Sequence, residues 1–218
     1  MIKVISLDIG GTLIKYNEAS VKKYSMQELS SLIDIDQKKV TDAYKNIFQK
    51  RIDSFDNLVK LFCNELQIKS NKKIIDFFKH KFYDNNIETN IDESYIKIIK
   101  KLKEHGYKVI LFSNACCLQK NKINESISNI VDKVYYSYEL KYTKSDKESY
   151  KIIEKELKNK PEEFLHIGDT LKSDYIKPIE NGWNALYFGI SNDNKINSIN
   201  DLDEIFKYLD INSITRGK

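Results

Sequence analysis

The chain is poor in the residues that interrupt or cross-link a fold. Its 218 residues include only 7 glycines, 2 prolines and 3 cysteines. So little glycine and proline argues against a long flexible linker. The cysteines, Cys63, Cys116 and Cys117, follow no metal-binding or disulfide spacing, and their odd number favours a reducing compartment.

The sequence also lacks the segments that direct a protein to a membrane or to nucleic acid. No apolar run approaches the roughly 18 residues of a membrane span, and the chain starts with a strand pattern instead of a signal peptide. The net charge of +4 comes from dispersed lysines and glutamates, without a basic block that contains aromatic residues. We therefore expect a cytoplasmic protein that binds neither nucleic acid nor membrane.

Two kinds of periodicity divide what is present. Between residues 15 and 90, apolar residues recur at helical spacing and no strand pattern appears. From residue 91 onwards strand and helix patterns alternate, as in a parallel sheet with helices on both faces. The sequence predicts an α/β fold in which residues 1–14 and 91–218 form a Rossmann-like core. Residues 15–90 form an inserted, all-helical cap domain.

The pattern also predicts where individual elements begin and end. In the insertion, Ser54 is expected to cap a helix. The core elements expected after the first strand are a helix from Asp92 to Gly106, strand 107–112, helix 118–127, strand 133–136, a helix behind a Ser145–Glu148 capping box, strand 164–167, a helix from about Asp174, strand 184–188 and a closing helix near 202–209.

Polar residues follow three of these strands. Asp8 ends the first strand, Ser113 and Asn114 end the second, and Asp169 ends a later one. Because the carboxyl ends of parallel strands lie at one edge of the sheet, where α/β folds bind ligands, we expect these side chains to meet. After Asp8, residues 10–12 (Gly-Gly-Thr) predict a tight loop whose backbone can approach an oxyanion closely.

The carboxylates at this edge predict a metal site. Asp8, Asp169 and Asp174 would repel one another unless a cation lay between them. Oxygen ligands without histidine or cysteine favour a hard ion, and Mg²⁺ is the expected one. Lys144 is expected to reach the same edge, where a lysine and the Ser113 hydroxyl suit a phosphate oxygen.

In order and spacing, these residues resemble the motifs of the haloacid dehalogenase superfamily, which is dominated by phosphatases with an aspartate nucleophile. The resemblance spans the whole chain, including a helical cap after the first motif. The four matching stretches are residues 8–13, similar to Asp-x-Asp-Gly-Thr, residues 111–114, Lys144, and residues 168–174.

The resemblance implies a role for each residue. Asp8 would be the nucleophile that forms an aspartyl-phosphate, and it would also bind Mg²⁺. The remaining implied roles are metal binding by the Gly10 carbonyl, Asp169 and Asp174, phosphate binding and catalysis by Lys144, phosphate binding by Ser113, contact with substrate by Asn114, and support of the phosphate-binding loop by Thr12.

Position 10 departs from the family pattern. Members usually carry an aspartate there as general acid and base, whereas Gly10 has no side chain to transfer a proton. General acid–base catalysis contributes about 10² to 10⁴ in rate. Three explanations remain open: a substrate with a good leaving group, a proton donor supplied by the cap as in related phosphonate-cleaving members, or ligand binding without turnover. A dehalogenase is disfavoured because Asp169 and Asp174 indicate a metal.

No side chain stands out in the sequence as a substitute acid. Glu18 and His80 are expected on the surface, and His166 is expected in the core. Cys116 and Cys117 follow the second strand closely and are expected to pack as small residues. No single lysine of the insertion can be selected.

Two other function classes compete with a hydrolase. The Asp-x-Gly-Gly-Thr loop also resembles the first phosphate loop of sugar kinases, but a β-hairpin and a second glycine-rich loop are missing. A catalytically impaired phospholigand-binding protein on the same fold is the other alternative. The expected partner is a small-molecule substrate. Its identity, and whether the chain is a monomer or a homodimer, do not follow from the sequence.

Overall fold

The computed structural model describes residues 1–14, 22–84, 91–122 and 125–210. Its centre is a six-stranded, all-parallel sheet in the order β3-β2-β1-β4-β5-β6. The strands are β1 (Val4–Leu7), β2 (Lys108–Ser113), β3 (Lys133–Tyr136), β4 (Phe164–Gly168), β5 (Asn184–Phe188) and β6 (Ser198–Ile199). The predicted α/β fold with a Rossmann-like sheet is therefore confirmed.

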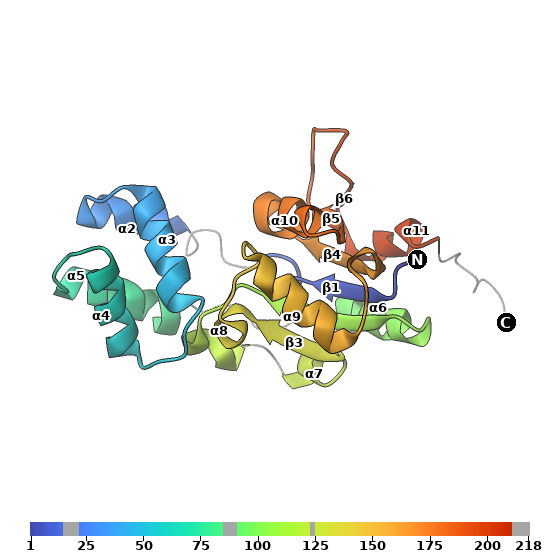
Figure 1. Cartoon of the computed structure of the whole chain (residues 1–218), viewed down its shortest axis with the longest axis horizontal. Helices are drawn as coiled ribbons and strands as arrows, with labels where there is room; N and C mark the ends of the chain where they lie inside the picture. The colour runs from blue at the N-terminus through green and yellow to red at the C-terminus, as the bar shows by residue number, and fades with distance from the viewer. Residues whose placement is uncertain (15–21, 85–90, 123–124, 211–218) are drawn as a thin grey trace.

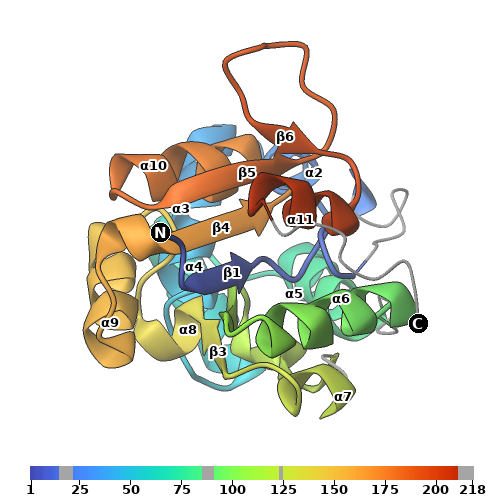
Figure 2. The ribbon, with the colours of Figure 1, turned by 90° about the vertical axis from the view of Figure 1, so that its right-hand side faces the viewer.

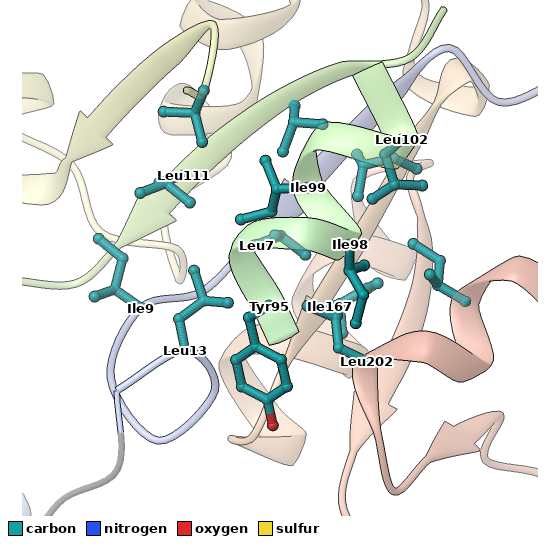
Figure 3. Packing of buried hydrophobic residues seen from close by; sticks show 14 of the residues in the cluster. Leu7, Ile9, Leu13, Tyr95, Ile98, Ile99, Leu102, Leu111, Ile167 and Leu202 are labelled. Atoms are coloured by element: carbon teal, nitrogen blue, oxygen red, sulfur yellow. The ribbon is translucent and has the colours of Figure 1, made fainter. Parts of the chain in front are cut away.

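Alternating side chains of each strand enter two different hydrophobic layers. Leu7, Leu111 and Ile167 lie on one face, which is covered by α6 (Glu93–Glu104), α7 (Glu125–Ser128) and α11 (Ile205–Tyr208) (Figures 2 and 3). Figure 3 shows α6 lying across these strands, with Ile99 and Leu102 pointing into the layer. Asp92 caps this helix as predicted, by accepting a hydrogen bond from the backbone N–H of Ser94.

The opposite face of the sheet is covered by α9 (Lys147–Leu157). Tyr150 of α9 packs edge-on against Phe112 and Trp183, and Trp183 stacks on Phe164 with ring centroids 4.2 Å apart. The central strands, four to six residues long, are buried on both faces and consist mostly of apolar residues, as the strands of parallel sheets do. This burial fixes the register, and so fixes which strand ends lie side by side.

Residues 22–84, here called the helical segment, bury a separate set of apolar side chains. It contains α2 (Met26–Ile33), α3 (Gln37–Phe48), α4 (Phe55–Glu65) and α5 (Lys72–Lys79), and α5 continues as a π-helical turn over His80–Asp84. Each of the four helices starts at a side chain that accepts a backbone N–H bond, and Ser54 does so as predicted. The rings of Phe48, Phe62 and Phe78 form the centre of the cluster.

The helical segment lies at the end of the molecule toward which β1 and β3 point (Figure 1). Cys116, in the loop after β2, is buried in the cluster of the helical segment, so the two parts of the chain pack together there. The sheet therefore presents its carboxyl edge to the helices. Among the described residues, no helix is both long and apolar enough to cross a membrane.

Several expected local features are wrong. No Ser145–Glu148 capping box forms: Asp146 is the N-cap of α9, and its carboxylate bonds elsewhere. The region 118–127 divides into a 3₁₀ helix at Cys117–Lys122 and the short α7, and the closing helix starts with a 3₁₀ turn. Asp174 does not begin a helix but lies inside a π-helical turn at Leu171–Ile176, followed by α10 (Lys177–Glu180). Strand β6 and α8 (Ser137–Leu140) were not predicted.

Candidate active site

Three of the predicted site residues form one buried ionic cluster at the carboxyl edge of the sheet. The ammonium of Lys144 lies 2.5 Å from Oδ1 of Asp8 and 2.6 Å from Oδ1 of Asp174. The Lys144 and Asp174 side chains are 2% exposed, and Asp8 is 9% exposed. Unpaired charges are costly to bury, and clusters of buried ionisable groups are common at functional sites. This cluster is therefore a candidate functional site.

The backbone places Asp8 next to Asp169. The N–H of Asp8 continues the ladder of β1 by bonding to the carbonyl of Ile167 at 2.9 Å. The chain then turns at Gly11, whose φ is +83°, and a Cβ there would lie 2.0 Å from Oδ2 of Asp169. Only glycine allows this turn and this close approach.

The carboxylates fit a divalent cation. Asp8, Asp169 and Asp174 each offer an oxygen, and these oxygens lie within 4.8 Å of one another. An all-oxygen donor set with three carboxylates suits Mg²⁺. Lys144 balances only part of this negative charge, so a cation would relieve the repulsion that remains.

The electrostatics of the cluster separate the two carboxylates. Burial raises the pKa of Asp8 to about 7, and the repulsion of Asp174 adds to this effect while Lys144 opposes it. Burial also opposes ionisation of Asp174, but Lys144 and His166 outweigh it and hold the pKa of Asp174 below its usual range. Burial favours a neutral Lys144 amine, yet the two carboxylates raise its pKa. A cation beside Asp8 would favour the ionised carboxylate that a nucleophile requires.

Lys144 is held at both ends. Its carbonyl accepts a hydrogen bond from the Tyr150 hydroxyl at 2.8 Å, and its N–H donates to Oδ1 of Asn114 at 2.9 Å. Its ammonium also lies 5.6 Å from the centre of the Phe112 ring. Asn114, expected to face the substrate, therefore uses its side-chain oxygen to position the lysine.

His166 contacts Asp174, and no pattern in the sequence indicates this contact. Its Nε2 lies 3.3 Å from Oδ1 of Asp174, and its Nδ1 lies 2.8 Å from the Ser6 hydroxyl. Burial lowers the pKa of His166 to about 4, and the charge of Lys144 acts in the same direction. In the neutral ring, the partners assign Nδ1 as acceptor from Ser6 and Nε2–H as donor to Asp174. The expected core position of His166 is confirmed, and it also orients a site carboxylate.

A cavity of about 340 Å³ opens onto the cluster. Its lining includes Asp8, Gly10, Ser113, Asn114, Lys144 and Asp174 from the predicted site, together with Ser145, Thr170, Lys172 and Ser173 from neighbouring segments, Lys45 from α3, and Gln49, the C-cap of α3. The core thus supplies the charged floor, and α3 supplies one wall. The sequence could not select Lys45 or Gln49 because their helix carries other polar residues.

Thr12, His80 and Cys116 are described by the structure but do not line this cavity. Thr12, assigned by the resemblance to support of the loop, is 1% exposed, and its buried side chain does not line the cavity. His80 is exposed and stacks on Tyr24, with ring centroids 6.0 Å apart. Burial raises the pKa of the Cys116 thiol to about 12, as expected for a packing residue. Glu18 lies outside the described residues.

Comparison with protein families gives a match over residues 2–176 to the haloacid dehalogenase-like hydrolase family. Because this match spans most of the 218 residues, the chain belongs to that family of hydrolases. The matched range contains Asp8, Lys144, Asp169 and Asp174. Comparison with curated proteins gives no match.

Solved structures share the fold at low sequence identity. A predicted haloacid dehalogenase-like hydrolase from Porphyromonas gingivalis has a TM-score of 0.63 and 18% identity, covering 96% of this chain and 98% of that one. A predicted phosphoglycolate phosphatase from Haemophilus somnus has a TM-score of 0.59 and 14% identity, covering 95% and 98%. An enzyme of the same family from Bacteroides thetaiotaomicron, in complex with magnesium and inorganic phosphate, has a TM-score of 0.59 and 20% identity, covering 88% and 97%.

Proposed function

We propose that this hydrolase acts on a small phosphorylated metabolite, uses Mg²⁺, and forms a covalent intermediate on Asp8. The observation that carries the proposal is the buried Asp8–Lys144–Asp174 cluster on the floor of a cavity. Residues 15–90 would be a cap domain, because α3 forms a wall of that cavity and the helices bury their own core. The magnesium and phosphate bound by the Bacteroides enzyme support the proposed metal and substrate class.

The residues at the carboxyl edge of the sheet would each have a distinct role in the reaction. Asp8 Oδ would attack phosphorus and displace the leaving-group oxygen, and water would then attack the phosphorus of the aspartyl-phosphate, which releases inorganic phosphate and restores the Asp8 carboxylate. The Lys144 ammonium would bind a phosphate oxygen, aided by the Ser113 hydroxyl at the same strand edge. Mg²⁺, when bound by Asp8, Asp169, Asp174 and the Gly10 carbonyl, would neutralise negative charge on the phosphate. Thr170 N–H and His166 hold the carboxylate of Asp174 in place, at 2.9 Å and 3.3 Å.

Proton transfer is the step that this site supports least. The cavity-lining carboxylates among the described residues are Asp8 and Asp174, and both contact Lys144. Within the described part of the chain, no carboxyl group on the cavity wall replaces the aspartate missing at position 10. The site therefore favours substrates whose leaving group departs without protonation, such as acyl or aryl phosphates. The lack of a side chain at Gly10 also supports the alternative function, a phospholigand-binding protein without turnover.

The test is phosphate release in the presence of Mg²⁺ from acetyl phosphate, an aryl phosphate and several sugar phosphates. We expect turnover of the first two, and loss of at least about 10³-fold in Asp8→Asn because the nucleophile is removed. Gly10→Asp is expected to raise the rate of phosphate release from sugar phosphates by about 10²-fold or more.

The same assay separates the two functions. If the wild type releases no phosphate from any substrate but Gly10→Asp does, the residues that bind phosphate are correctly placed, and the binding role is supported. If neither protein releases phosphate, the proposed hydrolysis is wrong. Mg²⁺ affinity, measured by calorimetry on wild type and Asp169→Asn, tests the metal site independently of turnover.

A further inference from the structure

The lysines of the cavity differ in how their charge is balanced. Lys144 is paired with two carboxylates on the floor. Lys45, on the α3 wall, is half-buried, and Lys172, at the start of the π-helical turn, is exposed. Within the part of the chain that the structure describes, neither Lys45 nor Lys172 forms an ion pair. Their positive charge is available to whatever fills the cavity.

Gln49 lies one helical turn after Lys45, and both side chains line the cavity. The side-chain oxygen of Gln49 is buried and has no hydrogen-bond partner among the described residues. This oxygen accepts hydrogen bonds and so requires a donor such as water, whereas the Gln49 amide NH₂ can donate to an anion. The two side chains thus present a cation and a polar amide on the same face.

Two sets of contacts fix this face above the cavity. The opposite side of α3 carries Val40, Tyr44 and Ile47, which are buried in the cluster of the helical segment. Just after α3, the ammonium of Lys50 lies 2.9 Å and 3.1 Å from the two carboxylate oxygens of Asp146. Asp146 also accepts bonds from the N–H and hydroxyl of Thr143, the residue before Lys144. The ion pair therefore ties the α3 wall to the loop that carries the floor lysine.

We propose that the site selects substrates that carry a second anionic group, which Lys45 binds while Lys144 binds the reacting phosphate. This inference rests on the proposed function and names its substrate class. The cavity holds more than a phosphate group, and its far wall offers a cation, an amide and no carboxylate. A carboxylate and a second phosphate both supply the required charge. Lys172 would add to the positive potential from the core side.

The test measures binding with compounds that cannot be hydrolysed, so it does not depend on turnover. Calorimetric titrations with Mg²⁺ compare phosphonoacetate, methylenebisphosphonate and ethylphosphonate, of which only the last lacks a second anionic group. We expect each of the first two to bind at least about tenfold more tightly than ethylphosphonate, as for a charge-assisted hydrogen bond in a half-buried site. Their relative affinities show whether the second group is a carboxylate or a phosphate.

Variants locate the selectivity. Lys45→Gln should reduce the tenfold preference to about twofold or less, because it removes the charge and retains a polar side chain. Lys38→Gln is the matched control: it removes a lysine from an exposed position of the same helix, outside the cavity, and should keep the preference. Circular dichroism confirms that both variants are folded.

Kinetics with phenyl phosphate and 3-carboxyphenyl phosphate repeat the comparison on substrates with similar leaving groups. A wild-type preference for the carboxylate that disappears in Lys45→Gln supports the inference. Equal affinities for all three phosphonates in the wild type overturn it, even if phosphate is released from every aryl ester. A preference that survives in Lys45→Gln also overturns it. Absence of turnover with a preserved binding preference instead contradicts only the proposed hydrolysis.

Discussion

The sheet and the helical segment bury different kinds of side chain. The sheet and its loops enclose charged and polar groups, including Asp8, Lys144, His166 and Asp174. Among the described residues of the helical segment, Ser30 is the one polar residue that is buried as a whole, and phenylalanine fills the centre. The sheet can hold charge because its strand ends, loops and π-helical turn provide hydrogen-bond partners from several directions. A small helical bundle, whose backbone groups bond within each helix, offers fewer partners.

This difference assigns the two parts different tasks. The proposed chemistry requires atoms held to within about 0.5 Å, and the buried hydrogen bonds and ion pairs of Lys144 and Asp174 supply that rigidity. The helical segment places half-buried polar side chains, Lys45 and Gln49, over the reacting groups. Under the proposed selection by Lys45, substitutions in α3 would change the substrate preference without disturbing the charged floor.

The largest effect is expected when the floor of the cavity loses its cation, Lys144. Lys144→Met leaves Asp8 and Asp174 buried without their positive partner, and we expect the free energy of unfolding to fall by about 3–5 kcal/mol. Urea denaturation measures the loss. The double variant Lys144→Met/Asp8→Asn should recover part of it, because one of the stranded charges is removed. A single variant as stable as the wild type would show that the cluster does not contribute as inferred.

In the helical segment, substitutions should reduce stability through the loss of packing and not through the loss of charge pairs. Phe78 is fully buried and touches Phe48, Phe62 and Phe82. Phe78→Ala is expected to destabilise the protein by about 3 kcal/mol, the lower end for such a cavity, because the neighbouring rings can close part of it. Tyr83→Ala, at a position 55% exposed, is the control and should cost well under 1 kcal/mol. Similar losses in both variants would contradict the inferred core.

Lys81 gives the smallest effect and sharpens the contrast, because it is a largely enclosed cation of the helical segment with no carboxylate partner given by the structure. Burial lowers its pKa to about 8 from 10.5, and its ammonium donates to the Tyr24 carbonyl at 2.8 Å. Between these pH values the unfolded chain binds more protons than the folded one, so stability gained from this group rises with pH.

We therefore expect wild type to gain on the order of 2 kcal/mol relative to Lys81→Met between pH 7.5 and pH 10. Chemical denaturation at both pH values measures the difference. Lys79→Met, at an exposed position two residues earlier, should leave the difference from wild type constant. A constant difference in Lys81→Met as well would show that burial of this amine has no such cost.

The sequence predicted the sheet well because its signals are local. Val4 to Leu7, and the later strands at 133–136 and 184–188, are short runs of β-branched, aromatic and apolar residues, and the structure has strands there. The Asp92 and Ser54 caps were likewise local patterns. The Ser145–Glu148 box failed because Asp146 bonds to Thr143 and to Lys50, a residue 96 positions away. Tertiary contacts of that kind leave no local signal.

The floor of the site was predictable for the same reason, and its supports were not. Asp8 and Asp174 follow strands that share an edge, so their meeting follows from the topology. The contact of His166 with Asp174 depends on which face of β4 the ring occupies and on Ser6 opposite it. The selection of Lys45 among many lysines depends on how α3 is oriented. Both are matters of packing.

The order of strands has a consequence for how the chain assembles. Residues of β1 pair only with β2 and β4, so Leu7 lies between Leu111 and Ile167, both made more than a hundred positions later. The helical segment, by contrast, is held by contacts between neighbouring helices, which form early and fast. During synthesis, β1 stays unpaired while the helices that follow it in the sequence fold, and both of its edges are paired only after β4 has been made. The first residues of the candidate site to be made are thus among the last to be put in place, because a chain that ends before β4 lacks one of the two strands that flank β1.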